Sequence, residues 1–168
     1  MAIHPNFPSS PHSILEPNIR WFPADEVLRE SSYEKLLPPL VHELRKKVKE
    51  WRDKGYIGAS DTSIALLTWW FKTEHLLPKA DGITVSFQYY FAQREAVETV
   101  IYLYDAIQVK DKYDLLRFDS SGAVSAGRCD EDWRRFVVKM ATGTGKTKIL
   151  SLILAWCYFL KIYEENSE

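Results

Sequence analysis

The stretch that decides the fold is Phe136-Val-Val-Lys-Met-Ala-Thr-Gly-Thr-Gly-Lys-Thr147, followed by Lys148-Ile-Leu-Ser-Leu-Ile-Leu-Ala-Trp156. A β-branched run, a loop with two glycines and an apolar run follow one another, which predicts a buried strand, a loop and a helix. Glycine tolerates backbone angles that other residues avoid and lets the backbone approach an anion closely. Gly143 and Gly145 therefore predict a loop whose amides converge on phosphate.

The residues of this loop have expected roles toward ATP and Mg²⁺. Lys146 should reach the β and γ phosphates, Thr147 should place its hydroxyl on Mg²⁺, and the helix should direct its positive end at the anion. These two residues are the predicted catalytic pair. The predicted nucleotide-binding residues of the loop are Ala141, Thr142, Gly143, Thr144, Gly145, Lys146 and Thr147.

The loop departs from the full pattern G-x-x-x-x-G-K-[ST] at one position, where Met140 replaces the first glycine. That glycine shapes the entry to the loop and contacts no phosphate, so the phosphate interpretation stands. The structural alternative, without phosphate binding, is a glycine-rich turn between a strand and a helix, with a solvated lysine. A dinucleotide fingerprint is excluded because its third glycine would fall at Lys148.

Composition predicts a globular domain. The chain has 168 residues, 46% of them apolar and 14% aromatic, which is enough to bury a core. Its net charge of −1 gives no overall signature of nucleic-acid binding, so any such contact must be local.

The cysteines and the apolar runs predict a reduced, cytoplasmic protein that does not enter a membrane. Cys129 and Cys157 form no C-x-x-C pair, and no histidine spacing adds a structural metal site. The apolar run 149–160 is shorter than the roughly 20 residues that a membrane span needs, so we expect it to be a helix buried against a sheet. The N-terminus has no secretory signal pattern.

Three longer helices are expected between residue 38 and the loop. The first runs from Pro38 to Lys54 and ends at Gly55; the second runs from Ser60 or Asp61 to about Leu76, closed by Pro78; the third runs from Tyr89 to Ile107. Pro5, Pro8, Pro11, Pro17 and Pro23 predict an extended arm at residues 1–23. A turn is expected at residues 79–82, and a flexible loop at 120–127.

Two features of these helices have both a structural and a functional interpretation. The first helix carries six basic side chains against three acidic ones on its polar face, and a solvated face is the simpler interpretation than a phosphate contact. The pair Trp69-Trp70 could stack on bases, but adjacent helical residues point in different directions, so core packing is preferred. On the third helix, the apolar face is expected at Ala92, Ala96, Val100, Leu103 and Ile107, with Gln93, Arg94, Glu95 and Glu98 off that face.

Two motifs make the sequence resemble a superfamily 2 helicase, specifically the N-terminal end of a DEAD/DEAH-box or type III restriction enzyme Res-subunit-like protein. Tyr90-Phe-Ala-Gln-Arg-Glu-Ala-Val-Glu98 is similar to the glutamine stretch upstream of motif I, and Met140-Ala-Thr-Gly-Thr-Gly-Lys-Thr147 is similar to motif I, where methionine at the first position is ordinary. The resemblance implies that Gln93 binds the adenine of ATP, because a carboxamide can donate to a ring nitrogen and accept from the exocyclic amine. The alternative is a solvated glutamine near a helix start. The separation of Gln93 from Lys146 is longer than in compact helicases.

The resemblance also implies further motor elements that should come after Thr147 and are not found there. A motor of this class needs a Walker B acidic pair and a second lobe, and residues 130–132 precede motif I, so they cannot be that pair. We therefore expect the chain to be the front piece of a larger enzyme. Residues 1–80 should form a proline-rich arm and a helical region, and residues 81–168 the start of the motor domain.

The expected fold class is α/β, an incomplete RecA-like P-loop domain, with this chain mostly helical and with little sheet. The implied function is ATP-dependent helicase or translocase action on DNA, with a methyltransferase subunit as a further partner. The expectation for the chain itself is weak ATP binding without turnover. The alternatives are another P-loop ATPase or kinase, and a non-catalytic interaction module.

Overall fold

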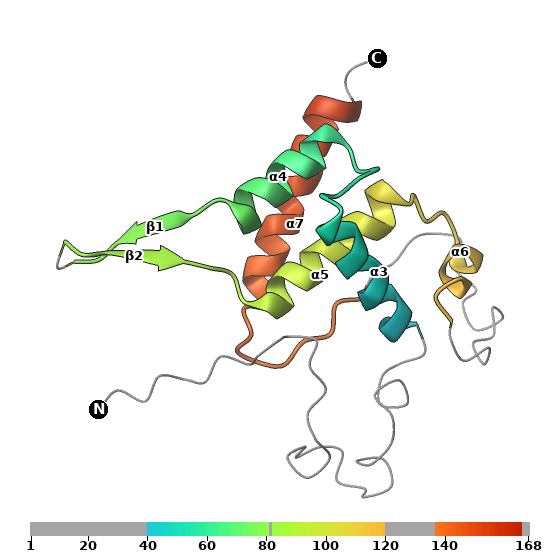
Figure 1. The fold of residues 1–168 in the computed structure, drawn as a ribbon, viewed down its shortest axis with the longest axis horizontal. Helices are drawn as coiled ribbons and strands as arrows, with labels where there is room; N and C mark the ends of the chain where they lie inside the picture. Colours follow the sequence, from blue (N-terminus) through green and yellow to red (C-terminus); the bar gives the residue numbers. More distant parts are fainter. Residues whose placement is uncertain (1–39, 81, 120–136, 166–168) are drawn as a thin grey trace, which may run out of the picture.

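The structure is a computed structural model that describes residues 40–80, 82–119 and 137–165. Helices dominate these residues, and the described strands form one two-stranded sheet (Figure 1). The elements in order are α3 (Val41–Asp53), α4 (Asp61–Lys72), β1 (His75–Pro78), β2 (Thr84–Phe87), α5 (Phe91–Ile101), η2 (Tyr102–Ala106), α6 (Lys112–Leu116), α7 (Lys146–Leu160) and η4 (Lys161–Glu165). The predicted arm and the predicted flexible loop lie outside the described residues.

The helix α5 lies between α3 and α7 and is the centre of the packing (Figure 1). The helix α4 packs on both α5 and α7. The main core therefore draws on all four helices and on the turn after α3. Its buried residues are Trp51, Tyr56, Leu67, Trp70, Val97, Val100, Ile101, Ile149, Leu152, Trp156 and Leu160.

Local signals explain where the first helices begin and end. Gly55 follows α3 with a φ of 79°, the left-handed conformation that glycine adopts without strain. Ser60 is the N-cap of α4, because its hydroxyl accepts from the amide of Ser63. Both boundaries agree with the sequence prediction.

The second helix ends earlier than predicted. It stops at Lys72, and residues 75–78, expected as its last turn, form β1 instead. β1 pairs antiparallel with β2, from His75 opposite Phe87 to Pro78 opposite Thr84. The two strands project from the helices as a hairpin (Figure 1), and between them the amide of Gly82 donates to the Lys79 carbonyl oxygen at 3.0 Å, as a turn in this region requires. The predicted division at residues 80 and 81 falls in this turn.

The buried strand predicted before the glycine loop is wrong for its described residues. Residues 137–140 have no regular secondary structure, and Val137 is 89% exposed. A strand exists only through hydrogen bonds to a neighbour, and within the described residues β1 and β2 pair only with each other. For the same reason α7 packs against α4 and α5 instead of against a sheet.

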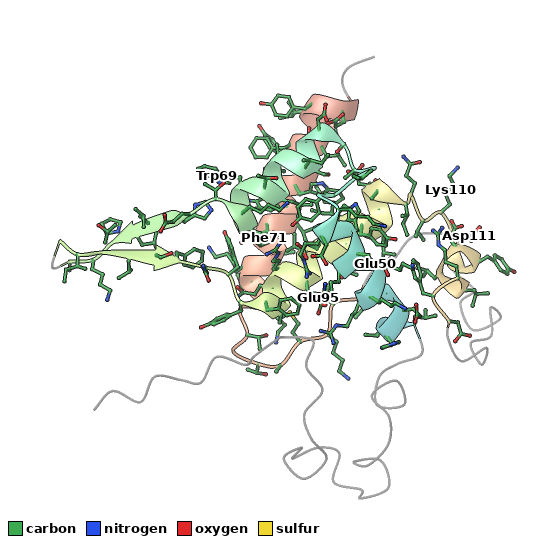
Figure 2. The ribbon with its side chains drawn as sticks, viewed as in Figure 1. Glu50, Trp69, Phe71, Glu95, Lys110 and Asp111 are labelled. Carbon is green, nitrogen blue, oxygen red and sulfur yellow. The ribbon has the colours of Figure 1, made fainter. Side chains whose placement is uncertain are left out.

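The buried face of α5 also differs from the prediction. Gln93 and Glu98, both expected off the apolar face, are 6% and 0% exposed, while Ala92 is exposed. Trp69 and Trp70 divide as adjacent helical residues should, with Trp70 in the core and Trp69 pointing outward at the base of the hairpin (Figure 2). The core interpretation of this pair is therefore confirmed for Trp70 only.

A candidate phosphate-binding loop

The residues of the predicted phosphate loop form a curled turn at the start of α7. Gly143 and Gly145 both have φ of 81°, in the left-handed region. The ammonium of Lys146 donates back to the carbonyl oxygens of Met140 at 3.3 Å and Ala141 at 3.1 Å. The hydroxyl of Thr144 also donates to the Ala141 oxygen, at 2.7 Å. These bonds close the loop on itself.

The curled loop leaves several backbone donors available. Among the described residues, none supplies an acceptor for the amides of Gly143, Gly145, Lys146 and Thr147, and no side chain caps α7. The first amides of any helix lack intrahelical acceptors and carry the positive end of the helix dipole. Such a group of amides is suited to an anion.

The charges around the loop favour the same kind of ligand. The first turn of α7 contains Lys146 and Lys148 and no acidic residue, although the positive end of a helix is normally stabilised by acidic side chains. Lys139 is a third exposed cation next to the loop. A bound anion would stabilise these lysines and the helix end together.

Gln93 is brought directly to this loop from α5. Its amide nitrogen donates to the Thr144 carbonyl oxygen at 3.0 Å, and its side-chain oxygen accepts from the amide of Tyr90 at 3.1 Å. A Cβ atom on Gly145 would lie only 2.2 Å from that Gln93 nitrogen. Gly145 is therefore favoured by its φ, and a larger residue there would force the end of the Gln93 side chain to move.

The remaining predicted residues are placed as follows. Ala141, Thr142, Gly143, Lys146 and Thr147 are exposed, and Thr144 and Gly145 are half-buried. Gln93 retains one N–H and one oxygen lone pair, but both ends of its amide already have partners within the protein. Its position holds the loop, and the adenine contact predicted for it stays a prediction. No cluster of three metal-ligating side chains occurs in the described ranges.

Sequence reasoning missed a polar network on the other side of α5. Glu98 accepts from both Arg52 and Arg94, with 2.7 Å between each Nε and a carboxylate oxygen, and the Tyr56 hydroxyl donates to it at 2.7 Å. Arg94 also donates to the Tyr56 oxygen at 3.1 Å. Burial and the neighbouring Glu98 raise the pKa of Tyr56, so this hydroxyl stays protonated. The spacing of Arg94 and Glu98 by four residues was the one available signal.

The charged face of α3 is largely used inside the protein. Arg45 pairs with Glu95, which lies on α5 facing α3 (Figure 2), and Arg52 pairs with Glu98. Lys47 and Lys49 pair with acidic residues of the same helix. These pairs favour the structural interpretation of this face.

No protein-family model matches the chain, and no curated protein or solved structure does either. The helicase resemblance accordingly depends on the two sequence motifs. Along the described ranges, no helix has both the length and the apolar character needed to cross a bilayer.

Proposed function

We propose that residues 140–147 bind the phosphates of ATP, and that the chain is the ATP-binding portion of a DNA helicase or translocase. The single observation that carries the proposal is the curled loop at the start of a fifteen-residue helix, with Lys146 at the first helical position and with backbone amides that no described residue accepts from. These features fit an anion without any rearrangement of the α7 backbone.

Each residue of the loop has a role in this proposal. The amides of residues 143–147 hold phosphate oxygens, Lys146 exchanges its bonds to Met140 and Ala141 for bonds to phosphate, and Thr147 offers its hydroxyl to Mg²⁺. In motors of this class, transfer of the γ-phosphoryl group of bound ATP to water supplies the energy for movement. Gln93 fixes the loop through Thr144, and this contact couples α5 to the nucleotide.

The assignment to a helicase is supported by the proximity of the two motifs that carry the resemblance. Gln93 and Thr144 are 51 residues apart in the chain and are joined by a hydrogen bond. In another P-loop ATPase or kinase, Gln93 would have no obvious role toward the nucleotide. The implied methyltransferase partner, the DNA substrate and a cytoplasmic location belong to the same proposal.

Nucleotide binding by isothermal titration calorimetry tests the proposal. With Mg²⁺ present, the chain should bind ATP, and Lys146→Ala should weaken binding at least tenfold. Lys161→Ala, at the other end of the same helical segment, is the matched control and should leave ATP affinity unchanged. Equal ATP affinity for the original chain and Lys146→Ala would refute the proposal. Gln93→Ala should reduce the preference for ATP over GTP if the adenine role is correct.

A further inference from the structure

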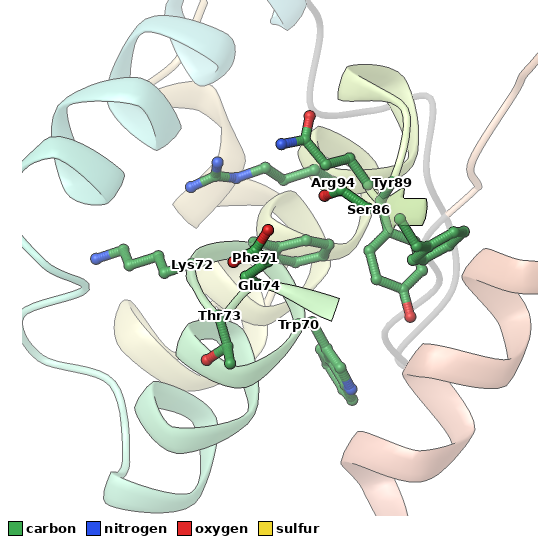
Figure 3. Close-up of a pocket in the computed structure, with 10 residues that line it drawn as sticks. Trp70, Phe71, Lys72, Thr73, Glu74, Ser86, Tyr89 and Arg94 are labelled. Carbon is green, nitrogen blue, oxygen red and sulfur yellow. The ribbon is translucent and has the colours of Figure 1, made fainter. Parts of the chain in front are cut away.

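A cavity lies away from the phosphate loop, at the base of the hairpin. It has a volume of about 340 Å³, within the range of small-molecule sites. It is bounded by the end of α4, the end of β2 and the start of α5 (Figure 3). The loop residues 140–147 do not contribute to it.

Aromatic rings form much of its wall. Trp70, Phe71, Phe87 and Tyr89 all line the cavity. Phe71 and Tyr89 pack edge to face at 5.4 Å between ring centroids, and Phe87 and Tyr89 do so at 4.9 Å. These contacts fix the orientation of the rings beside the cavity. Fixed aromatic rings are the surfaces on which nucleobases stack.

Positive charge lies beside these rings. Arg94 and Lys72 line the cavity, and their charged ends extend to the same side of it (Figure 3). Arg94 stands 5.4 Å from the centroid of the Phe71 ring. Within the described residues, Lys72 has no acidic partner, and Glu98 is shared by two arginines, so the local charge stays positive despite Glu74.

The rim is polar and open to solvent. Thr73, Ser86 and Gln88 line the cavity and are exposed. A polar, open rim allows a ligand to continue beyond the cavity, as a polynucleotide must on both sides of a bound base. Stacking aromatic rings beside positive charge are features of sites that bind single-stranded nucleic acid.

We propose that this cavity takes one base of a single-stranded nucleic acid, with Lys72 beside an adjoining phosphate. The choice of nucleic acid over another planar anion rests on the proposed function. The site is separate from the ATP site, so it places a strand contact on α4, β2 and α5, which precede the phosphate loop in the chain.

Blocking the cavity tests the proposal directly. Binding of a fluorescein-labelled twelve-residue oligothymidylate would be followed by fluorescence anisotropy. Ser86→Trp fills the cavity from β2 and should weaken binding at least tenfold. Thr84→Trp adds the same side chain two residues earlier on the same strand, outside the cavity, and should change affinity less than twofold. Circular dichroism checks that both variants fold.

The salt dependence of binding gives a second readout that does not depend on a bulky substitution. For a single strand, each phosphate contact contributes about −0.7 to the slope of log K against log salt. Lys72→Gln should therefore make the slope less negative by about 0.7, whereas Lys161→Gln should leave it unchanged. Equal effects of the two tryptophan variants, an unchanged slope for Lys72→Gln, or no oligonucleotide binding by the original chain would each overturn the proposal.

The two proposals fail in different ways. Lys146→Ala should lose ATP and keep the oligonucleotide, and Ser86→Trp should lose the oligonucleotide and keep ATP. ATP could also displace the oligonucleotide from the original chain. If it did so from Lys146→Ala as well, the cavity would be a mononucleotide site, and the strand proposal alone would be overturned.

Discussion

Replacing Gly145 by alanine separates the two reasons for glycine at that position. The φ of 81° costs an alanine about 1–2 kcal/mol, because its Cβ crowds the backbone in the left-handed region. The new Cβ would also lie 2.2 Å from the Gln93 nitrogen, so Gln93 must move and release the Thr144 oxygen. A lost hydrogen bond of this kind costs about 1 kcal/mol. We therefore expect Gly145→Ala to lower the free energy of unfolding by about 2–3 kcal/mol.

Gly143 provides a matched control. Its φ is the same, but a Cβ there would meet nothing within 4 Å. Gly143→Ala should therefore cost only the conformational part, about 1–2 kcal/mol. Urea unfolding followed by circular dichroism measures both variants. A double-mutant cycle with Gln93→Ala should reduce the cost of Gly145→Ala to that of Gly143→Ala. Equal costs for the two glycines, or a cost at Gly145 that Gln93→Ala does not change, would refute this reasoning.

Three further predictions concern the helical layer. Glu98→Gln removes the buried charge that pairs with Arg52 and Arg94, and urea unfolding should show a loss of about 3 kcal/mol. Glu95→Gln, in the half-buried pair with Arg45, is the control and should cost less. An equal loss in the two variants would argue against the network. Burial raises the pKa of Tyr56 above that of an unfolded tyrosine, so the stability contributed by its protonated hydroxyl should be fully present below pH 10 and should fall above it. Tyr56→Phe should therefore make the free energy of unfolding depend less on pH between pH 10 and 11. An unchanged dependence would contradict the assignment. Ser60→Ala removes the cap of α4 and should lower the thermal midpoint through a loss of about 1 kcal/mol, whereas Ser151→Ala on the exposed face of α7 should have a smaller effect.

The helices were predictable because their signals are local. The stop at Gly55 and the cap at Ser60 are both short-range patterns, and α3 ends and α4 begins where these patterns place them. The same is true of the glycine loop, whose left-handed backbone follows from Gly143 and Gly145. These features need no knowledge of distant residues.

The failures involve partners that are distant in the sequence. Leu76 and Leu77 continue the apolar pattern of α4, so nothing local distinguishes their strand from a last helical turn. Val137 and Val138 favour a strand, but a strand also needs a neighbour. Glu98 is buried because Arg52 and Tyr56, more than 40 residues earlier, satisfy it. The helical periodicity of apolar residues predicts that such a charged residue is exposed to solvent.

Glu98 also determines how α3 can sit on α5. Tyr56 holds a φ of 66°, which is strained for a bulky residue, and in this conformation its hydroxyl donates to the carboxylate. Sliding α3 by one turn would displace Arg52 by about 5.4 Å and leave part of a buried charge unmatched. The carboxylate thus favours this alignment of α3 on α5, the helix that also carries Gln93 to the glycine loop.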